Sequence, residues 1–324
     1  MNQNEVYEVA FEPKWQKIIS STYQSIVASG DVRITNDELT ELLDGCFDTH
    51  IHAAPDSYGW RVLSEADVAR KAVDCRFGGV VFKCQSAPSS CRQLFVQELA
   101  DMHADATGKR RVAVFSGVCC STQVGGYNPA AVEASFKMGG KYVWTPSKDA
   151  AHHHRAEGNP VPGVECIDEA GRLLPNVLEI LKLVAENDGV LGLSHNSAYE
   201  RFLLAKTAQE MGVQRIVVEH PMVHISRLTE EQMAEFFRMG VYLGMTYIGA
   251  VPNFIVPEVD KTEAARLIKK FGPARWVSQT DLTQLQTQDP VEGIRTLAKM
   301  LLSQGISEDD IRKIFVDNPR ELLF

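Results

Sequence analysis

The stretch Phe47–Asp56, which reads FDTHIHAAPD, decides the fold and the chemistry that we expect of this chain. Its apolar start predicts a short buried strand, and Pro55 with Asp56 ends that strand. Because a strand sends residues i and i+2 to the same face, His50 and His52 point the same way. Two imidazoles on one face can share a metal ion. An isolated His-x-His pair is equally consistent with two surface histidines, so the rest of the chain must decide.

Outward from this stretch, short apolar runs alternate with longer amphipathic segments. The apolar runs are nearly continuous, which is typical of parallel strands covered on both faces. The predicted strands are residues 46–52, 79–84, 112–118, 140–145, 190–195, 215–220, 241–247 and 275–281. The predicted helices are approximately residues 64–77, 89–107, 129–138, 174–187, 198–211, 228–239, 259–271 and 290–303.

Eight strand–helix pairs predict a (β/α)8 TIM barrel, in the α/β class. A doubly wound open sheet is the alternative, but it would need a glycine-rich turn after an early strand, and Ala-Ala-Pro-Asp follows His52 instead. Residues 1–45 predict an N-terminal helical extension, and residues 46–324 a single barrel domain that ends in a capping helix over 306–324. A long connection, residues 146–173, follows the fourth strand and is expected to hold a small hairpin.

Composition excludes several classes of protein. The 324 residues carry a net charge of −9, which argues against a nucleic-acid binder and against docking on anionic lipid. No apolar run approaches the length of a membrane span, and the first residues lack the pattern of a signal peptide. Seven cysteines without disulfide-type spacing indicate free thiols in a reducing compartment. We therefore expect a cytoplasmic protein; whether it forms a homo-oligomer stays open.

Residues that can bind a metal fall at the ends of the predicted strands, where barrel enzymes carry their chemistry. His195 ends the fifth strand, His220 the sixth and Asp281 the eighth. Together with His50 and His52 they predict a divalent-metal centre, with zinc as the first choice and manganese or iron as alternatives. One ion would be held by the two histidines of the first strand with Asp281, and a second ion by the other two histidines.

Lys83 ends the second strand, after the apolar run Val80–Phe82. A lysine buried beside cations loses its proton readily, because desolvation and like charge both lower its pKa. The neutral amine could take up carbon dioxide and become a carbamate, that is, a carboxylated lysine that bridges two metal ions. Alternatively, the ammonium group binds a substrate carboxylate. Cys84, on the neighbouring position, is a competing soft ligand.

The order of these ligands resembles that of the amidohydrolase superfamily of metal-dependent hydrolases, and the resemblance covers residues 46–324. The segment Asp317–Leu323 also resembles the Asn-Pro helix start found late in many members. The chain is most similar to a branch with Asp-x-His-x-His, a following Pro-Asp, and a lysine on strand 2, here Lys83. In many members the bridging lysine lies on strand 4, but here that strand ends Val143–Pro146 without a ligand, so one ion and two ions both remain open.

The resemblance implies a hydrolase that uses a metal-activated water on an amide, cyclic amide, or lactone or ester bond of a small molecule. Asp281 would be the catalytic base, and Lys83 or His220 would help to polarise the substrate carbonyl. The alternative is a one-metal decarboxylase or isomerase of a carboxylated small molecule on the same scaffold. A phosphoesterase would need more ligands, and a protein that only binds would not need Asp281.

Substrate contacts are expected from residues near the predicted mouth of the barrel. His152, His153 and Arg155 lie in the long connection after strand 4, and Gln85 follows strand 2. The histidines could contact the substrate or supply an extra metal ligand, and Arg155 could pair with an acidic group. Loops decide which substrate is bound, so residue types alone leave its identity open.

Overall fold

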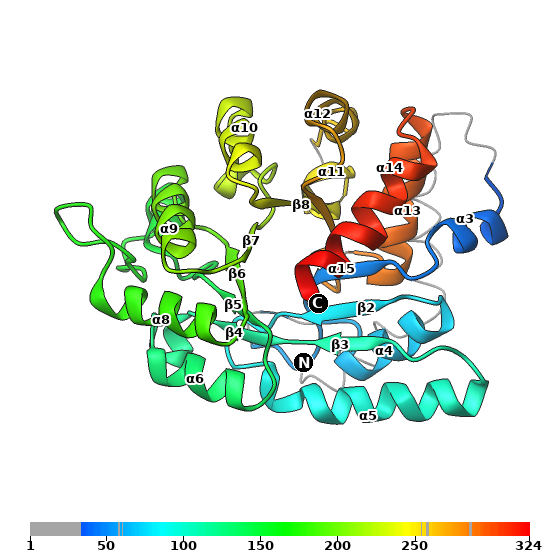
Figure 1. The fold of residues 1–324 in the computed structure, drawn as a ribbon, viewed down its shortest axis with the longest axis horizontal. Helices are drawn as coiled ribbons and strands as arrows, with labels where there is room; N and C mark the ends of the chain where they lie inside the picture. The colour runs from blue at the N-terminus through cyan, green and yellow to red at the C-terminus, as the bar shows by residue number, and fades with distance from the viewer. Residues whose placement is uncertain (1–33, 58, 60, 254, 257–258, 285–286) are drawn as a thin grey trace. The chain divides into compact units, whose positions relative to one another are not determined.

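A computed structural model describes residues 34–57, 59, 61–253, 255–256, 259–284 and 287–324 (Figure 1). The chain divides into two compact units, each built from separate segments. The first unit comprises residues 1–82, 94–114 and 245–321, and the second comprises residues 83–93, 115–244 and 322–324. The predicted helical extension falls mostly on residues 1–33, which lie outside the described residues, and only α3 (Asn36–Leu42) of it is described. The single domain over residues 46–324 stays a prediction.

The first unit is built around β1 (Phe47–Ile51), which lies between β2 (Gly79–Phe82) and β9 (Trp276–Gln279). β1 pairs in parallel with β2, and the sheet continues to β3 (Ala113–Phe115). On its other side, the Thr49 hydroxyl donates to the Ser278 carbonyl at 3.0 Å. The Asp281 N–H donates to the His50 carbonyl at 2.8 Å. The first and last strands are therefore neighbours, as a barrel requires.

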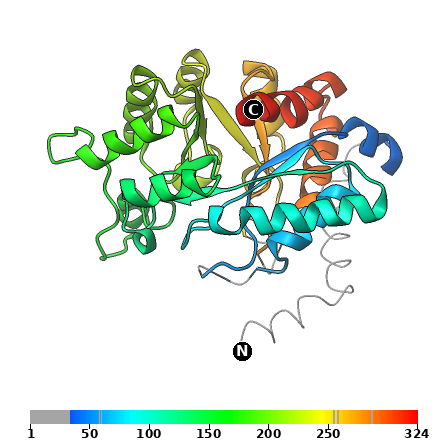
Figure 2. The ribbon, with the colours of Figure 1, turned by 60° about the horizontal axis from the view of Figure 1, so that its bottom comes forward.

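Helices flank these strands, and Figure 2 shows α5 from a second direction. They are α4 (Glu65–Asp74), α5 (Ser90–Thr107), α11 (Tyr247–Ala250), α12 (Glu263–Phe271), α13 (Pro290–Ser303), α14 (Glu308–Arg312), η3 (Lys313–Asp317) and α15 (Asn318–Leu323). The last three confirm the predicted helical ending. The Asn318 amide donates to the Trp276 carbonyl at 2.7 Å, so the start of α15 is tied to β9. Among the described residues, no helix is both long and apolar enough to cross a membrane.

The second unit contains the strands β4 (Gly117–Cys119), β5 (Tyr142–Trp144), β6 (Val190–Leu193), β7 (Arg215–Val218) and the first residues of β8 (Tyr242–Thr246). Neighbouring strands along this series pair in parallel. The connecting elements are η1 (Thr122–Val124), α6 (Pro129–Lys137), α7 (Ala151–Glu157), α8 (Pro175–Glu186), α9 (Ala198–Glu210), η2 (His224–Ser226) and α10 (Glu230–Arg238). The parallel strands with intervening helices match the predicted alternation.

Two expectations differ from the structure in detail. The expected strand 112–118 is divided at Ser116 into β3 and β4, because the Ser116 carbonyl accepts from the backbone of Lys141 at 2.8 Å. The following Gly117 lies so close to β5 that a Cβ there would be 2.0 Å from the Tyr142 carbonyl oxygen. The long connection is also not a bare loop, because it contains the helix α7. Its hairpin is confirmed by the antiparallel bridge between Ile167 and Leu173.

Candidate metal centre

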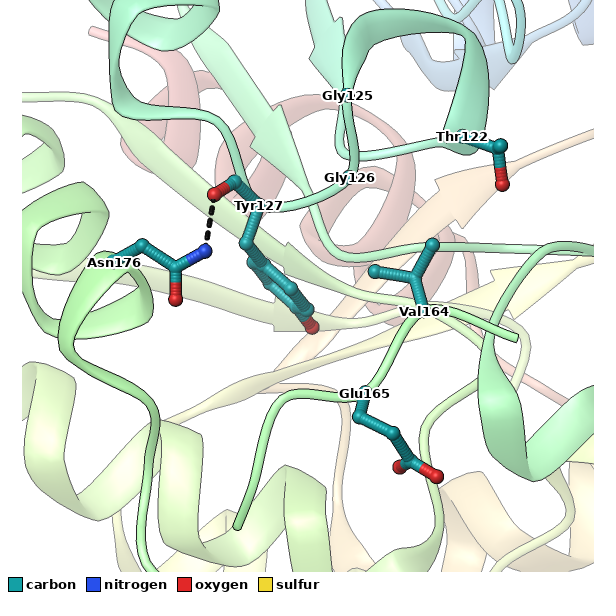
Figure 3. Close-up of a pocket in the computed structure, with 7 residues that line it drawn as sticks. All are labelled: Thr122, Gly125, Gly126, Tyr127, Val164, Glu165 and Asn176. Atoms are coloured by element: carbon teal, nitrogen blue, oxygen red, sulfur yellow. Dashed lines mark hydrogen bonds between the residues drawn. The ribbon is translucent and has the colours of Figure 1, made fainter. Parts of the chain in front are cut away.

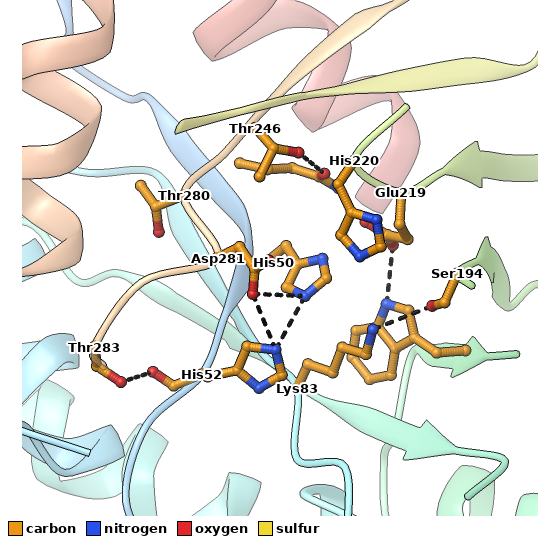
Figure 4. Close-up of polar contacts among 12 residues, drawn as sticks. His50, His52, Lys83, Ser194, Glu219, His220, Thr246, Thr280, Asp281 and Thr283 are labelled. Carbon is orange, nitrogen blue, oxygen red and sulfur yellow. Dashed lines mark hydrogen bonds and ion pairs between the residues drawn. The ribbon is translucent and has the colours of Figure 1, made fainter. Parts of the chain in front are cut away.

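Three predicted metal ligands meet in the first unit, where β1 and β9 end side by side. Figure 4 shows the side chains of His50, His52 and Asp281 pointing toward one another. The Nε2 atoms of the two histidines are 3.3 Å apart. Asp281 Oδ1 lies 3.1 Å from His52 Nε2 and 3.6 Å from His50 Nε2. In the described part of the chain, this is the one group of three or more His, Cys, Asp or Glu side chains whose ligand atoms converge within 4.8 Å.

The spacing of the three ligand atoms fits a divalent metal ion. Ligands about 2.0–2.1 Å from a tetrahedral zinc ion stand roughly 3.3–3.4 Å apart, close to the measured separations of 3.1, 3.3 and 3.6 Å. Both imidazoles are buried, whereas the Asp281 side chain keeps 18% of its surface exposed. A carboxylate and two imidazoles are a donor set typical of zinc and similar ions. These three residues therefore fit the divalent metal ion that the sequence predicted.

Asp48, buried at the base of the centre, ties β1 to β9. Its carboxylate accepts from the His50 N–H at 3.1 Å, and from the N–H and hydroxyl of Thr280 at 3.0 and 2.5 Å. Burial raises the pKa of Asp48 to about 8, and the nearby Asp281 carboxylate adds to the rise, while those three hydrogen bonds oppose it. Asp48 thus connects β1, at whose end the two histidines lie, with the segment after β9 that carries Asp281.

The backbone around Asp281 adopts an unusual conformation. Asp281 has φ +58° and Thr283 has φ +100°, which lie in the region of positive φ that residues other than glycine rarely adopt. The Thr283 hydroxyl donates to the His52 carbonyl, and the Thr283 carbonyl accepts from the Val62 N–H at 2.9 Å. Such conformations persist where surrounding contacts hold them, and they concentrate at functional sites.

A buried ion pair adjoins His52. Both Nη2 and Nε of Arg61 donate to Asp56 Oδ2, at 2.7 and 3.1 Å, and the same oxygen lies 3.7 Å from His52 Nδ1. At 3.7 Å the Asp56 carboxylate is beyond hydrogen-bond distance of the His52 ring, but it places a negative charge beside it. Asp56 therefore does more than end the strand, which is the only role that the sequence predicted for it.

The remaining predicted histidines cluster in the second unit. His195 Nδ1 lies 2.6 Å from His153 Nδ1, and the rings of His195 and His220 are 4.7 Å apart, edge to face. The pKa of His195 is held well below its usual value, mainly by burial and then by the neighbouring His220 and Lys83. His220 has φ +35°, and its Nδ1 lies 2.9 Å from Ser226 Oγ.

Lys83, the residue that follows β2, is buried and belongs to the second unit. Its Nζ donates to Ser194 Oγ at 3.1 Å and lies 5.7 Å from the centre of the Trp144 ring. The Trp144 indole in turn donates to Glu219 Oε1 at 3.0 Å. Glu219 is fully buried, and the sequence analysis did not single it out. Its position directly before the predicted ligand His220 was the one sign in the sequence that Glu219 lies near the site.

The predicted substrate contacts have diverse surroundings. His152 and Arg155 lie on α7 rather than in a loop, and Arg155 pairs with Glu165 at 2.5 Å while its side chain remains 57% exposed. His153 is buried against His195. Gln85 is buried, and its Oε1 finds no hydrogen-bond partner in the described part of the structure. An unpaired buried acceptor is costly, and among the four residues Gln85 is the one with a buried atom of this kind.

A separate pocket of about 360 Å³ lies in the second unit (Figure 3). It is lined by Thr122, Gly125, Gly126, Tyr127, Val164, Glu165 and Asn176. One wall is held by the Asn176 amide, which donates to the Tyr127 carbonyl at 2.6 Å. None of the predicted site residues lines this pocket, so its volume contributes no evidence to the metal centre.

Sequence comparison assigns the chain to a family. The model described as "Family of unknown function (DUF6282)" matches residues 45–244, which include β1 and the strands β6 and β7 that precede His195 and His220. The chain belongs to this family. No curated protein matches its sequence significantly.

Solved structures show what this family member resembles in three dimensions. An amidohydrolase from Pseudomonas aeruginosa aligns with a TM-score of 0.58 at 14% identity, covering 90% of this chain and 98% of that one. A probable dipeptidase, PvdM, from the same organism has a TM-score of 0.55 at 12% identity, covering 95% and 98%. A mutant PTE-like lactonase from Deinococcus radiodurans has a TM-score of 0.53 at 13% identity, covering 88% and 97%. The predicted (β/α)8 fold and the resemblance to amidohydrolase-type barrels are confirmed at the level of the fold.

Proposed function

We propose that this chain is a metal-dependent hydrolase of an amide, cyclic amide, or lactone or ester bond in a small molecule. The observation that carries the proposal is the spacing of the ligand atoms of His50, His52 and Asp281, which matches three corners of a tetrahedral metal site. The names of the structural relatives (an amidohydrolase, a probable dipeptidase and a lactonase) support hydrolysis of this general kind.

In this proposal the two Nε2 atoms and Asp281 Oδ1 hold the ion, with zinc as first choice and manganese or iron as alternatives. When bound, such an ion lowers the pKa of a coordinated water to about 7. Asp281 Oδ1 faces both imidazoles, which leaves Oδ2 of the partly exposed carboxylate to accept the water's proton and pass it to the leaving group. Asp48 and Thr280 hold the two strand ends in place while this proton moves.

The roles of the second unit's residues belong to the same proposal. His195 and His220 would hold a second ion, and Lys83 would act either as a carbamate ligand or as an amine that binds an anionic substrate group. A protein incubated with ¹³C-bicarbonate would show a carbamate carbon signal that disappears in Lys83→Arg if the first form is present. If no such signal appears, the amine form stands. His152, His153, Arg155 and Gln85 stay proposed as substrate contacts.

The test is hydrolysis by the metal-free protein after it is loaded separately with zinc, manganese or iron. We expect at least one amide, cyclic amide or lactone of a broad panel to turn over only with metal, and the product to gain one oxygen from ¹⁸O-labelled water. A protein that binds metal but hydrolyses nothing in such a panel would contradict the proposed reaction.

One observation favours the second candidate, a one-metal decarboxylase or isomerase of a carboxylated small molecule. Among the described residues a single three-ligand group is found, which suits one ion better than two. Metal-dependent loss of carbon dioxide without ¹⁸O in the product would select this reaction. In either case we propose a small-molecule substrate, no nucleic-acid or membrane partner, and a cytoplasmic location.

A further inference from the structure

We propose that Arg201 is the centre of a buried site for a small planar oxyanion, such as formate or bicarbonate. Arg201 lies near the start of α9 and keeps only 1% of its surface exposed. It belongs to the second unit, and the proposed site uses no residue of the first. The mechanism proposed above leaves this side chain without a role.

Most of the hydrogen-bonding capacity of Arg201 is unused. A guanidinium group carries five N–H donors. Nη2 donates to the Ser226 carbonyl at 2.8 Å. Nε and Nη1 are buried as well, and neither has a hydrogen-bond partner among the residues that the structure describes. Because proteins pair nearly all of their buried donors, these two nitrogens point to a ligand that accepts hydrogen bonds.

The positive charge of Arg201 also lacks a partner. The neighbouring carboxylate of Glu200 is engaged elsewhere: its Oε2 accepts from the Ser197 N–H at 2.6 Å, and its Oε1 lies 3.9 Å from Arg155 Nη2. Within the described ranges, no carboxylate forms an ion pair with Arg201.

Arg201 stays charged at neutral pH. Burial lowers its pKa to about 10, and the charge of Glu200 opposes that decrease. A water molecule could satisfy the buried donors but would leave the charge unbalanced, whereas an anion does both. The ligand is therefore expected to be negatively charged.

The shape of the guanidinium group and its burial indicate the kind of anion. The planar fork of an arginine matches an acceptor with two oxygens in one plane, as in a carboxylate. Since Arg201 is almost completely enclosed, its ligand must be enclosed too and can have only a few atoms. Formate and bicarbonate meet both conditions, whereas a carboxylate attached to a larger substrate does not.

The proposed anion would lie near two of the predicted metal ligands. Ser226, whose carbonyl binds Arg201, also places its hydroxyl 2.9 Å from His220 Nδ1. The charge of Arg201 is one of the causes that lower the pKa of His195. An anion on Arg201 would offset that charge beside both histidines. Because the anion would bind the metal-free protein, this inference can fail while the hydrolase proposal stands, and the reverse also holds.

The first test is differential scanning calorimetry of the full-length, metal-free protein in sodium formate or sodium benzoate, at equal concentration and ionic strength. We expect formate to raise the melting temperature, because an anion that binds only the folded state stabilises it. Benzoate carries the same charge but is too large for an enclosed site, so it should cause no rise.

Arg201→Met removes the charge and the donors but keeps a long side chain, and its melting temperature should be the same in both salts. Arg238→Met, at the end of α10 with a side chain that is 70% exposed, is the matched control and should keep the response to formate. An unresponsive wild type, an equal rise with benzoate, or a formate response that persists in Arg201→Met would overturn the inference.

A second test needs only the wild type, so it decides the matter even if Arg201→Met does not fold. Crystals are grown without formate and with formate at the lowest concentration that raises the melting temperature. We expect planar density of three heavy atoms within hydrogen-bond distance of Arg201 Nε or Nη1 in the second crystals. Water alone at both nitrogens in those crystals would contradict an anion site.

Discussion

Asp281 contributes both a backbone hydrogen bond and a carboxylate to the candidate centre. Its N–H joins β9 to β1 through the His50 carbonyl at 2.8 Å, and its Oδ1 faces the two imidazoles. It adopts φ +58°, so the neighbouring contacts must hold it in place. A substitution that preserves its shape therefore separates the charge of Asp281 from its structural contribution.

For Asp281→Asn we expect turnover to fall by about 10²–10⁴-fold, because an amide cannot accept the proton that a general base takes. The amide oxygen and the two histidines should still retain the metal. Steady-state kinetics and elemental analysis of the same preparation measure both effects. Asp309→Asn, at an exposed position on α14, is the control. Full activity in Asp281→Asn would show that another group is the base.

The sequence predicted the residues that lie on one strand better than those that meet across elements. His50 and His52 share a face because of the two-residue period of a strand, so their meeting could be foreseen. The contact between His153 and His195 could not be foreseen, since it depends on a helix within a segment that looked like a loop. Ser226 lies in the turn after His220, and no spacing rule places its hydroxyl against Nδ1.

At the scale of the element, Gly192 allows three strands of the second unit to pack closely. It lies opposite Trp144 on β5 and Val217 on β7. A Cβ at this position would be 2.3 Å from the Trp144 ring and 2.8 Å from Glu219 Oε1. Both of those side chains are fully buried and joined by a hydrogen bond, so neither can move aside easily.

We expect Gly192→Ala to lower the free energy of unfolding by about 1–3 kcal/mol, the usual cost of overpacking a core. Chemical denaturation measures the change. Gly59→Ala is the control, because nothing lies within 4 Å of a Cβ built there and its φ is not in the left-handed region. Equal stability of the two variants would show that the strands can separate around Gly192 without penalty.

Strands and helices were predictable wherever hydrophobic periodicity ran without interruption, as in α13, whose expected and observed limits are both 290–303. The predicted bounds of strands and helices were wrong where backbone contacts from distant residues decide the structure. The division at Ser116 depends on hydrogen bonds from Lys141 and Tyr142, which no local pattern reveals. The helix α7 was missed because its residues Ala151–Glu157 include three consecutive histidines without an amphipathic repeat.

At the scale of the whole molecule, metal binding should be linked to folding. The candidate ligands come from β1 and from the residue range after β9, which are more than 200 positions apart in the sequence. An unfolded chain cannot hold them together, so an ion that binds only the folded state stabilises it. The sequence could predict this convergence because strand order in a barrel brings the first and last strands together.

We expect the melting temperature to rise by several degrees when zinc is added to the metal-free protein, since a ligand at about 100 times its Kd contributes roughly 2.7 kcal/mol. Differential scanning calorimetry with and without a chelator measures the shift. The variant His50→Ala/His52→Ala should melt at the same temperature under both conditions. A shift of equal size in this variant would place the stabilising ion elsewhere.

The most direct test of the account is the metal content of the purified protein, measured by elemental analysis after dialysis against metal-free buffer. The account predicts at least one zinc, manganese or iron ion per wild-type chain and the loss of one ion in His50→Ala/His52→Ala. A wild-type protein without bound metal after loading, or a double variant with the same content, would contradict a metal centre at the meeting point of β1 and β9.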